Sequence, residues 1–582
     1  MLKRPLALAL GLAVTAPLAA LPLLGIAYAT SLGLTLLIAF VLAQSWDWVG
    51  GEAGYVNLGH FIFYGLGAYI FSILLVRGVS LPLCLAAACV LTAAIAAVLA
   101  FPLFRLTGDY FAFATLALLP LFELLAFNLT PITGGADGIV LPPHYVLGPA
   151  FYLALALAVV TLILTGVLTS SRFGYSLKSI RNDELAAEVV GIRILPAKIA
   201  VLVLSAAFAA LAGAVQGWQL SYIDPPTVFG LNVALVPISM ALLGGSGKRW
   251  GPVVGVLILF ALQQWLLVNI TVLQATVYGL VILLIGRFMP GGLLRAQSVQ
   301  NVPFVRALAQ DHHRTVKPSN VVSLHANQLP IRPPGERGGV LLETRDLTMR
   351  FGGNVAVNAV NITIRQGEIV GLVGANGSGK TTLFNCISKV YEPTGTIVFD
   401  GRPLADLRRD EVSRIGVGRT FQNPRPFGDL TVTENIAIAL TYGADRKSLA
   451  AAFDESAQFA AFVGLTGRLA TRADALTLQE KKSLELARAL ALKPKLLLVD
   501  EVASGLTPAE VRQFVSHIRD IRDTYGITVI WVEHIFSALA QVVDRLIVLE
   551  QGVVIADAPL AEAVQDPRVL KSYLGSGPAH VA

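Results

Sequence analysis

Charged residues and cysteines are scarce in this sequence. Only 14% of its 582 residues are Asp, Glu, Lys or Arg, whereas 55% are hydrophobic. A soluble protein carries about 25% charged residues, so this composition excludes a chain that folds entirely in water. Cys84 and Cys89 lie in one apolar stretch and Cys386 lies far from both, so neither a disulfide framework nor a metal-ligand cluster is indicated. We expect all three to be packing residues.

Two further absences limit the architecture. No internal repeat with a period of roughly 20 to 50 residues occurs, which excludes a solenoid. Lys3 and Arg4 precede the first apolar stretch, as in a secretory signal, but no clear small-residue cleavage site follows it. We therefore expect this stretch to be retained as a membrane span.

Apolar residues are concentrated between residues 5 and 287, and the rest of the chain has ordinary globular composition. A run of about 20 apolar residues is needed to cross a bilayer whose hydrocarbon core is roughly 30 Å thick. About ten such runs can be placed in this half by that criterion. The expected spans are 5 to 28, 30 to 46, 55 to 76, 80 to 104, 110 to 130, 148 to 169, 197 to 222, 228 to 245, 251 to 268 and 271 to 287.

The distribution of Lys and Arg predicts the orientation, because these residues resist translocation. With the N-terminus inside, only Arg77 falls in an outer loop. The second half of the chain is then cytoplasmic, and the net charge of +6 reflects this topology and a preference for anionic headgroups rather than nucleic acid. The inner loops receive Lys3, Arg4, Arg105, Arg172, Lys178, Arg181, Arg193, Lys198, Lys248, Arg249 and Arg287.

A polar segment with several prolines separates the two halves. Such composition is typical of a connector between independently folded units. We divide the chain into a membrane domain over residues 1 to 290, a linker over 291 to 339 and a second domain over 340 to 582. His312 and His313 lie in this linker without other nearby ligands, so we expect a solvated pair and not a metal site.

In the second domain, β-branched runs such as "EIVGLVG" and "KLLLVDE" alternate with helical patterns, which indicates an α/β domain with a mainly parallel sheet. The segment "GANGSGKTT" matches the phosphate-binding pattern G-x-x-x-x-G-K-[ST] between a predicted strand and a predicted helix. Its glycines let backbone N–H groups surround phosphate oxygens, Lys380 reaches the β and γ phosphates, and Thr381 can ligate Mg²⁺. The residues expected to contact ATP here are Gly374, Asn376, Gly377, Ser378, Gly379, Lys380, Thr381 and Thr382.

Two acidic residues end the buried strand predicted in "LLLVDE". Asp500 can hold the Mg²⁺ shell, and Glu501 can orient or deprotonate the attacking water. An isolated strand that ends in Asp-Glu would be unremarkable. Its position downstream of the phosphate-binding loop favours a catalytic role.

These motifs make the segment 340 to 582 resemble the ATP-binding cassette ATPases over essentially its whole length. The members of this family hydrolyse ATP with Mg²⁺. The resemblance implies that Phe351 in "TMRFGG" stacks on adenine and that Gln422 in "RTFQNPRPF" is the Q-loop residue that ligates Mg²⁺ with Thr381 and Asp500. It also implies that His534 in "WVEHIF" contacts the γ-phosphate. Taken singly, the three could be a strand-edge aromatic, a surface amide and a helix-cap imidazole.

The signature of that family, Leu-Ser-Gly-Gly-Gln, aligns here with "LTLQE", residues 476 to 480. Thr477 keeps the hydroxyl that would face a nucleotide, but Gln479 stands where the family has a glycine next to the γ-phosphate. Thr507 likewise replaces an aspartate that usually follows "SGL". In the family, each nucleotide lies between the phosphate-binding loop of one cassette and the signature of its partner. We therefore expect an asymmetric pair, in which the site that uses this signature is the weaker one.

The membrane half resembles the permease subunits of branched-chain amino-acid importers over about residues 30 to 290. The resemblance rests on "GEAGYVNLGHFIFYGLGAYI", "FRLTGDYFAFATLAL", "TGGADGI", "SLKSIRNDELAAEVVGI" and "GGSGKRWGPVVG". The polar stretch that begins at residue 173 resembles the short permease helix that docks on the cassette near the Q-loop; an ordinary solvated loop is the alternative. The cassette's "RFGGNVAVNAVNITIRQGEIVGLVGANGSGKTTLFN" and "DPRVLKSYLG" resemble the ATPase subunits of the same systems.

The sequence therefore predicts a multi-domain chain, in which an all-α polytopic membrane domain of about ten helices precedes an α/β P-loop ATPase domain. The resemblance implies ATP-driven import of hydrophobic amino acids across a bacterial inner membrane. It also implies a second permease and a second ATPase subunit, or a homodimer, and a periplasmic substrate-binding protein. Import of urea, short amides or aromatic acids is the first alternative. A polypeptide exporter and a regulatory ATPase are less favoured.

Asp109 and Glu123 are acidic residues of the membrane half that lie in or near its expected spans. Glu123 lies inside an expected span, where a charge is costly in lipid. It either helps to recognise a substrate ammonium group or holds helices together. Asp109 lies near a membrane boundary, and we expect it to be structural.

Overall fold

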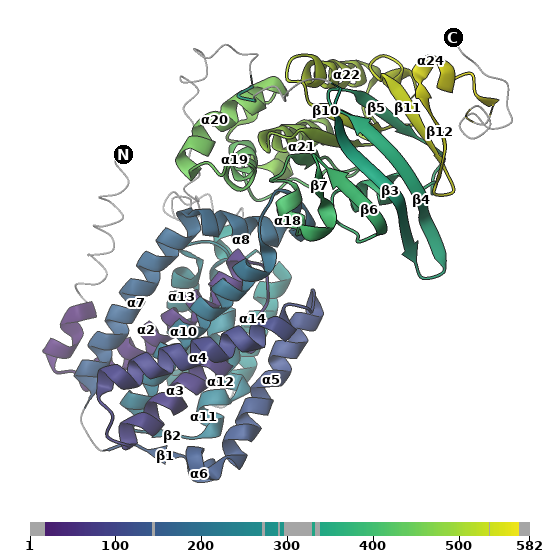
Figure 1. Cartoon of the computed structure of the whole chain (residues 1–582). Helices are drawn as coiled ribbons and strands as arrows, with labels where there is room; N and C mark the ends of the chain where they lie inside the picture. Colours follow the sequence, from purple (N-terminus) through teal and green to yellow (C-terminus); the bar gives the residue numbers. More distant parts are fainter. Residues whose placement is uncertain are drawn as a thin grey trace. The chain divides into compact units, whose positions relative to one another are not determined.

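The computed structural model describes residues 18–142, 146–269, 274–288, 291–295, 329–331, 338–534, 536–567 and 569. Its contacts divide the chain into two compact units (Figure 1). The first consists of Met1–Arg181 and Leu195–His312, and the second of Asn182–Ile194 and His313–Ala582. The short segment Asn182–Ile194 therefore belongs to the cassette unit, although it lies between two helices of the membrane half.

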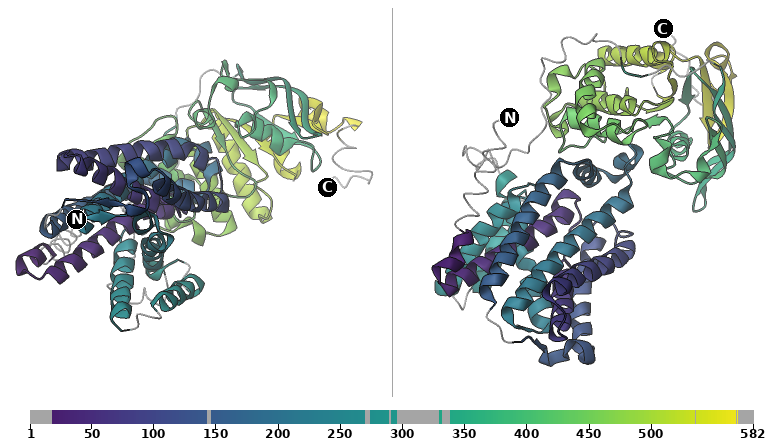
Figure 2. Two further views of the ribbon diagram at one scale, coloured as in Figure 1. Left: turned by 90° about the horizontal axis from the view of Figure 1, so that it is seen from below. Right: turned by 60° about the vertical axis from the view of Figure 1, so that its left-hand side comes forward.

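The first unit is a bundle of apolar helices that run side by side (Figures 1 and 2). Leu and Ala dominate these helices and favour the helical conformation, which satisfies every backbone polar group inside a membrane. The longer helices are α2 (Ala27–Asp47), α3 (Phe61–Val76), α4 (Leu81–Leu103), α5 (Asp109–Asn128), α7 (Leu147–Ser170), α8 (Arg172–Asn182), α10 (Ile194–Leu220), α12 (Leu231–Gly244), α13 (Gly251–Asn269) and α14 (Gln274–Phe288). The short elements are α6 (Thr130–Thr133), α11 (Pro225–Phe229) and the antiparallel pair β1 (Ile139–Val140) and β2 (Tyr222–Ile223).

Within the described residues, seven helical stretches are long and apolar enough to cross a membrane: Ala27–Glu52, Leu81–Leu103, Asp109–Asn128, Leu147–Ser170, Ile194–Leu220, Pro225–Gly244 and Gly251–Asn269. All seven coincide with expected spans. The spans expected at 55 to 76 and 271 to 287 correspond to the shorter helices α3 and α14. Most of the span expected at 5 to 28 lies outside the described residues.

Small residues let α3 and α10 approach each other closely. A Cβ atom on Gly67 would lie 2.2 Å from the carbonyl oxygen of Ala210, and one on Gly213 would lie 2.0 Å from that of Tyr64. Such close backbone contact is how glycine promotes helix packing in lipid. Glu123 is half-buried on α5, and its two suggested roles stay predictions.

The second unit contains two sheets and confirms the α/β prediction. The larger sheet has the order β12-β11-β5-β10-β9-β8, in which only β12 is antiparallel to its neighbour. Its strands are β5 (Ile369–Val373), β8 (Val417–Arg419), β9 (Leu496–Asp500), β10 (Thr528–Val532), β11 (Arg545–Glu550) and β12 (Val553–Pro559). The antiparallel sheet β4-β3-β6-β7 consists of β3 (Val340–Phe351), β4 (Asn354–Arg365), β6 (Thr394–Phe399) and β7 (Arg402–Pro403).

One hydrophobic core joins the two sheets through helix α17 (Lys380–Ile387). Phe384 of this helix packs with Phe399 of the antiparallel sheet and Leu498 of the parallel sheet. Because β5, β9 and β10 are buried on both faces, their sequences are continuous apolar runs without alternation. Their carboxyl ends meet at one edge of the sheet, which is where ligands bind in such folds.

The remaining helices of the cassette unit are α9 (Glu184–Val189), α18 (Arg409–Val412), α19 (Val432–Tyr442), α20 (Leu449–Phe462), α21 (Leu478–Ala491), α22 (Pro508–Asp523), α23 (Phe536–Leu539) and α24 (Leu560–Ala563). Helices α19, α20 and α21 pack against one another. The domain boundaries expected at 290 and 340 stay predictions, because most of the linker, including His312 and His313, lies outside the described residues.

Candidate functional site

The phosphate-binding loop connects strand β5 to helix α17, as the sequence predicts. Gly377 and Gly379 have φ angles of +79° and +103°, in the left-handed region that favours glycine. A Cβ atom on Gly379 would lie 2.3 Å from the carbonyl oxygen of Ala356, so this position has no room for a side chain.

Lys380 lies inside this loop. Its Nζ atom donates hydrogen bonds of 2.9 Å and 3.0 Å to the carbonyl oxygens of Gly374 and Ala375. Burial lowers the pKa of Lys380, and the nearby carboxylates of Glu501 and Asp500 oppose this shift. The ammonium group is therefore held by the loop, and its charge is favoured by the two acidic residues at the end of β9, which β10 separates from β5.

The loop also contains a buried hydroxyl group whose hydrogen-bonding capacity is unused. Ser378 is buried, and its Oγ atom has no hydrogen-bond partner in the described part of the chain. Asn376, Gly377 and Thr381 are exposed around it. A buried hydroxyl without a partner, next to a helix N-terminus, is suited to a phosphate oxygen.

Asp500, the last residue of β9, is suited to a metal shell. It is buried, its Oδ2 atom lies 3.5 Å from a guanidinium nitrogen of Arg419, and its Oδ1 atom has no hydrogen-bond partner among the described residues. Burial raises the pKa of Asp500, and the positive charge of Arg419 opposes this shift. An oxygen acceptor left free beside the phosphate-binding loop is the kind of ligand that Mg²⁺ prefers.

The three residues expected to carry catalysis lie together. The Nε2 atom of Gln422 donates to Oε2 of Glu501 at 2.5 Å, and the Nε2 atom of His534 lies 2.8 Å from Oε1 of the same carboxylate. The backbone N–H of Glu501 donates to the carbonyl oxygen of Val532, which ties the backbone that carries this carboxylate to strand β10. One carboxylate thus receives side chains from two separate loops.

The aromatic ring of Phe351 is positioned so that a ligand can stack on it. It ends strand β3, its side chain is 43% exposed, and its ring meets that of Tyr391 edge to face with centroids 5.0 Å apart. Tyr391 follows α17 in the sequence, and no sequence motif indicated that it would contact Phe351. The pair forms an aromatic edge that can support a base by stacking.

The signature segment begins helix α21 and does not join this cluster in the described structure. Thr477 accepts a hydrogen bond of 3.3 Å from the backbone N–H of Glu480, and the Glu480 carboxylate accepts one of 2.9 Å from the N–H of Thr477. This is a capping box, and "TLQE" is its sequence pattern. Neither Leu478 nor Gln479 has a positive φ, so the absence of glycine does not strain this helix start.

Two buried residues that the sequence did not single out hold the loop after Glu501. Lys482 of the signature helix donates to the carbonyl oxygens of Val502, at 2.6 Å, and Ser504. Glu533 accepts from the N–H of Ala503 at 2.5 Å. Their sequence contexts give no hint of this role, because each contact joins residues at least 20 positions apart.

The segment Asn182–Ile194 belongs to the cassette unit, which agrees with docking for the later part of the polar stretch that begins at residue 173. The part up to Arg181 belongs to the first unit. Asp183 caps helix α9 through the N–H of Ala186, and its other oxygen accepts from Arg425 at 2.9 Å. Asn182 accepts from the N–H of Asp429 at 3.2 Å. Arg425 is three residues after Gln422, so the segment meets the cassette beside the Q-loop.

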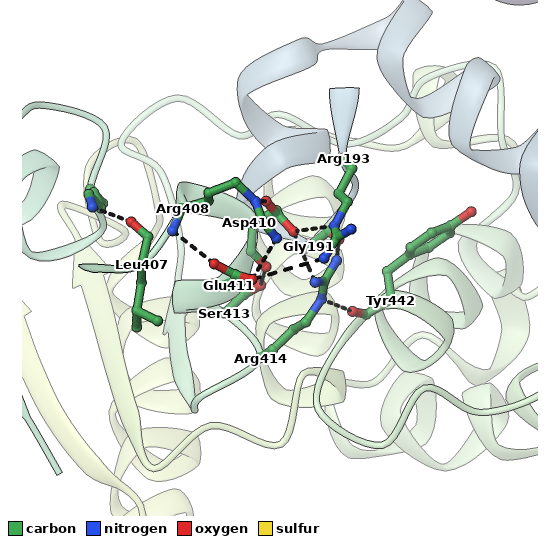
Figure 3. A network of polar contacts seen from close by, with 10 residues as sticks. Gly191, Arg193, Leu407, Arg408, Asp410, Glu411, Ser413, Arg414 and Tyr442 are labelled. Carbon is green, nitrogen blue, oxygen red and sulfur yellow. Dashed lines mark hydrogen bonds and ion pairs between the residues drawn. The ribbon is translucent and has the colours of Figure 1, made fainter. Parts of the chain in front are cut away.

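Ion pairs with helix α18 fix the other end of this segment (Figure 3). Glu188 pairs with Arg409 at 2.5 Å, and Arg193 pairs with Asp410 at 3.3 Å. Arg414 donates to the carbonyl oxygen of Gly191 at 2.5 Å and pairs with Asp410 at 2.9 Å. The segment therefore has polar contacts along its whole length.

Two known protein families match different parts of this chain. A family described as "Branched-chain amino acid transport system / permease component" matches residues 8–286, and one described as "ABC transporter" matches residues 357–504. The high-affinity branched-chain amino acid transport ATP-binding protein BraF of Pseudomonas aeruginosa is 35% identical over 249 residues, which are 40% of this chain and 98% of BraF. The chain belongs to the ABC transporters.

The chain is also similar to a second curated relative and to a solved structure. LivG of Salmonella typhimurium, with the same description as BraF, is 36% identical over 249 residues, again 40% of this chain and 98% of the relative. A solved nucleotide-free ATP-binding cassette from an ABC transporter is 25% identical, with a TM-score of 0.37, over 40% of this chain and 98% of its own.

The chain is thus a membrane ABC transporter in which a permease domain is fused to its ATPase. Its cassette is an ATP-binding and ATP-hydrolysing domain. Such a cassette acts on the cytoplasmic side, as the positive charges of the inner loops predict. The fold class and the family predicted from the sequence are confirmed.

Proposed function

We propose that this ABC transporter imports branched-chain amino acids across a bacterial inner membrane, with ATP hydrolysis as its energy source. The agreement between the two halves carries this proposal. The permease family and the cassette's relatives are separate matches on separate parts of the chain, and both descriptions refer to branched-chain amino acids. The segment Asn182–Ile194 supports an importer, because it lies between helices α8 and α10 of the permease half in the sequence and contacts the cassette beside the Q-loop.

The residues of the site have distinct proposed roles. Lys380, the hydroxyl group of Ser378 and the loop N–H groups bind the phosphates, and Phe351 supports the adenine. Asp500, Thr381 and Gln422 would hold Mg²⁺, which would supply positive charge against the phosphate oxygens. Thr477 is proposed to contact the nucleotide held mainly by a partner cassette.

Glu501 is the proposed general base. Its two oxygens keep lone pairs beside the contacts with Gln422 and His534, so the carboxylate can accept a proton from water. As that proton leaves, the water oxygen bonds to the γ-phosphorus and the bond to the bridging oxygen breaks, which gives ADP and phosphate. His534 orients the carboxylate and the γ-phosphate in this step.

The proposed assembly needs further subunits. A second permease and a second cassette complete the two nucleotide sites, and a periplasmic binding protein delivers the amino acid. A different partner cassette with an intact signature would make the motor asymmetric. A homodimer would make both sites depend on "LTLQE".

Uptake of labelled leucine by cells that carry the complete system tests the proposal. We expect uptake that excess isoleucine or valine reduces and that excess urea does not, and Lys380→Ala should abolish it. Uptake reduced by urea alone would favour the alternative substrate class. Uptake that persists with Lys380→Ala would contradict ATP-driven transport.

A further inference from the structure

The signature helix α21 contains a buried carboxylate that none of the roles above uses. Glu485 is 2% exposed. Its Oε2 atom accepts from the backbone N–H of Phe421 at 3.2 Å, and its Oε1 atom accepts from the N–H of Arg425 at 3.1 Å. These two N–H groups lie on either side of Gln422 in the sequence, so one carboxylate fixes both ends of the short loop that carries it.

A second residue of α21 strengthens this attachment. Arg488 lies one turn after Glu485 and pairs with its Oε1 atom at 3.4 Å. The same guanidinium donates to the carbonyl oxygen of Arg425 at 2.8 Å and lies 4.8 Å from the ring centroid of Phe427. Both backbone polar groups of Arg425 are therefore held by the signature helix.

Packing does not hold Gln422 itself. Gln422 and Asn423 are exposed, and Pro424 is only half-buried. The side chain of Gln422 nevertheless reaches Glu501 at 2.5 Å. A hydrogen bond this short depends on the position of the backbone that carries it, and the Glu485 contacts set this position.

We propose that Glu485 is a positioning residue for ATP hydrolysis: by holding the N–H groups of Phe421 and Arg425, it keeps the amide of Gln422 on Glu501. The inference rests on the proposed roles of Gln422 and Glu501. The signature helix then has two roles in this proposal. It faces the nucleotide of a partner cassette, and it aligns the catalytic groups of its own cassette.

Glu485→Gln tests this role with little change in shape. The amide keeps one oxygen acceptor and turns an NH₂ donor toward the other N–H, so one of the two contacts is lost. We expect kcat for ATP hydrolysis to fall by about tenfold, since small misplacements of catalytic groups cost up to about a hundredfold. KM for ATP should stay within about twofold, because the phosphate-binding loop is not touched.

The experiment is a double-mutant cycle on the complex extracted by a tag on this chain and placed in lipid nanodiscs. Gln422→Ala, Glu485→Gln and the double variant are compared with the unchanged complex. If Glu485 acts through Gln422, the double variant has the kcat of Gln422→Ala alone. If the two losses multiply, the inference is wrong while the role of Gln422 stands. A normal kcat in Gln422→Ala would overturn the proposed role of Gln422 and the inference with it.

A matched control separates positioning from stability. Glu455 is another largely buried carboxylate, paired with Lys447 and with Lys493 at 3.3 Å, on helix α20. Glu455→Gln should lower the melting temperature and leave kcat unchanged; an equal loss of kcat would contradict the inference. If Glu485→Gln does not assemble, Glu485→Asp keeps the charge on a shorter side chain, and a normal kcat in that variant would also contradict it.

Discussion

The imidazole Nε2 atom of His534 lies 2.8 Å from one carboxylate oxygen of Glu501. Gln422 occupies the other oxygen, so residues that follow three different strands converge on one carboxylate. The backbone of Glu501 has a φ angle of +45°, a left-handed conformation that costs about 1 to 2 kcal/mol for a residue other than glycine. Such strain is typical of functional positions, where the surrounding contacts maintain it.

Replacing Glu501 by glutamine should stop catalysis and spare binding. The amide keeps the shape of the carboxylate but cannot accept a proton from water, so we expect ATP hydrolysis to fall by about 10² to 10⁴-fold. Nucleotide affinity should change little. Phosphate release and equilibrium ATP binding by the nanodisc complex measure the two quantities. Glu550→Gln is the matched control, because this exposed glutamate ends strand β11, which β5 and β10 separate from β9. Hydrolysis at the normal rate in Glu501→Gln would exclude the general-base role.

Reversing the charge of Glu188 should uncouple uptake from the cassette. Glu188→Arg turns the 2.5 Å ion pair with Arg409 into a repulsion beside the docked helix. We expect leucine uptake to fall by about fivefold, the equivalent of about 1 kcal/mol for a partly exposed pair. Adding Arg409→Glu should restore part of the uptake, and only part, because Arg409 also donates to the carbonyl oxygens of Lys389 and Val390.

Exchange of another ion pair in the same unit provides the control for that experiment. Glu343 and Arg345 pair at 2.9 Å on strand β3, where Arg345 is exposed and Glu343 is half-buried. Their exchange should leave uptake unchanged. An equal loss of uptake in this control, or no rescue by the second substitution, would contradict a specific contact between Glu188 and Arg409.

Much of the architecture can be predicted from the sequence because it depends on local patterns. The apolar runs predict the long helices, and the glycines between Gly374 and Gly379 predict a loop that only small residues can form. The Asp-Glu pair after an apolar run predicts the end of a parallel strand. "TLQE" also contains the capping-box pattern that starts α21. This pattern is visible in the sequence, although the same residues align with a family signature that contains glycine.

The supporting contacts of the site could not be predicted in this way. Glu485 reaches a loop 64 residues earlier in the chain, and Glu533 reaches one 30 residues earlier. Lys482 looks like a surface residue of an amphipathic helix until the loop after β9 covers it. Only the three-dimensional fold brings these groups together, and a single sequence carries no signal for such pairs.

The stability of the complex should depend on pH through Glu485. Burial raises the pKa of Glu485 from 4.5 to about 7, against the opposing charges of Arg488 and Arg419 and the N–H groups of Arg425 and Phe421. The folded state then binds the proton more tightly than the unfolded state, so Glu485 costs stability as pH rises from about 4.5 to about 7, by at most about 1.4 kcal/mol per pH unit. Above this window the effect is constant.

Thermal unfolding of the nanodisc complex across this pH range measures the effect. Glu485→Gln lacks the titrating group, so the difference in melting temperature between the unchanged chain and this variant should drift between pH 4.5 and 7 and then level off. Other titrating groups are common to both proteins and cancel in the difference. A difference that stays flat throughout would show that Glu485 does not titrate in this window.

Restoring a glycine to the signature tests the proposed asymmetry of the motor. Gln479 lies in the first turn of α21 with a helical backbone, so its departure from the family acts through its side chain and not through strain. If that side chain keeps a partner's nucleotide at a distance, Gln479→Gly should raise ATP hydrolysis by the complex severalfold. Gln479→Ala should have most of the same effect, because it removes most of the same side chain without the roughly 1 kcal/mol by which glycine destabilises a helix.

Native mass spectrometry of the complex decides how the result applies. A second, different cassette leaves one site with an intact signature, whereas two copies of this chain make both sites depend on Gln479. Unchanged hydrolysis in both variants would mean that "LTLQE" binds nucleotide as it stands and that the two sites are equivalent in this respect.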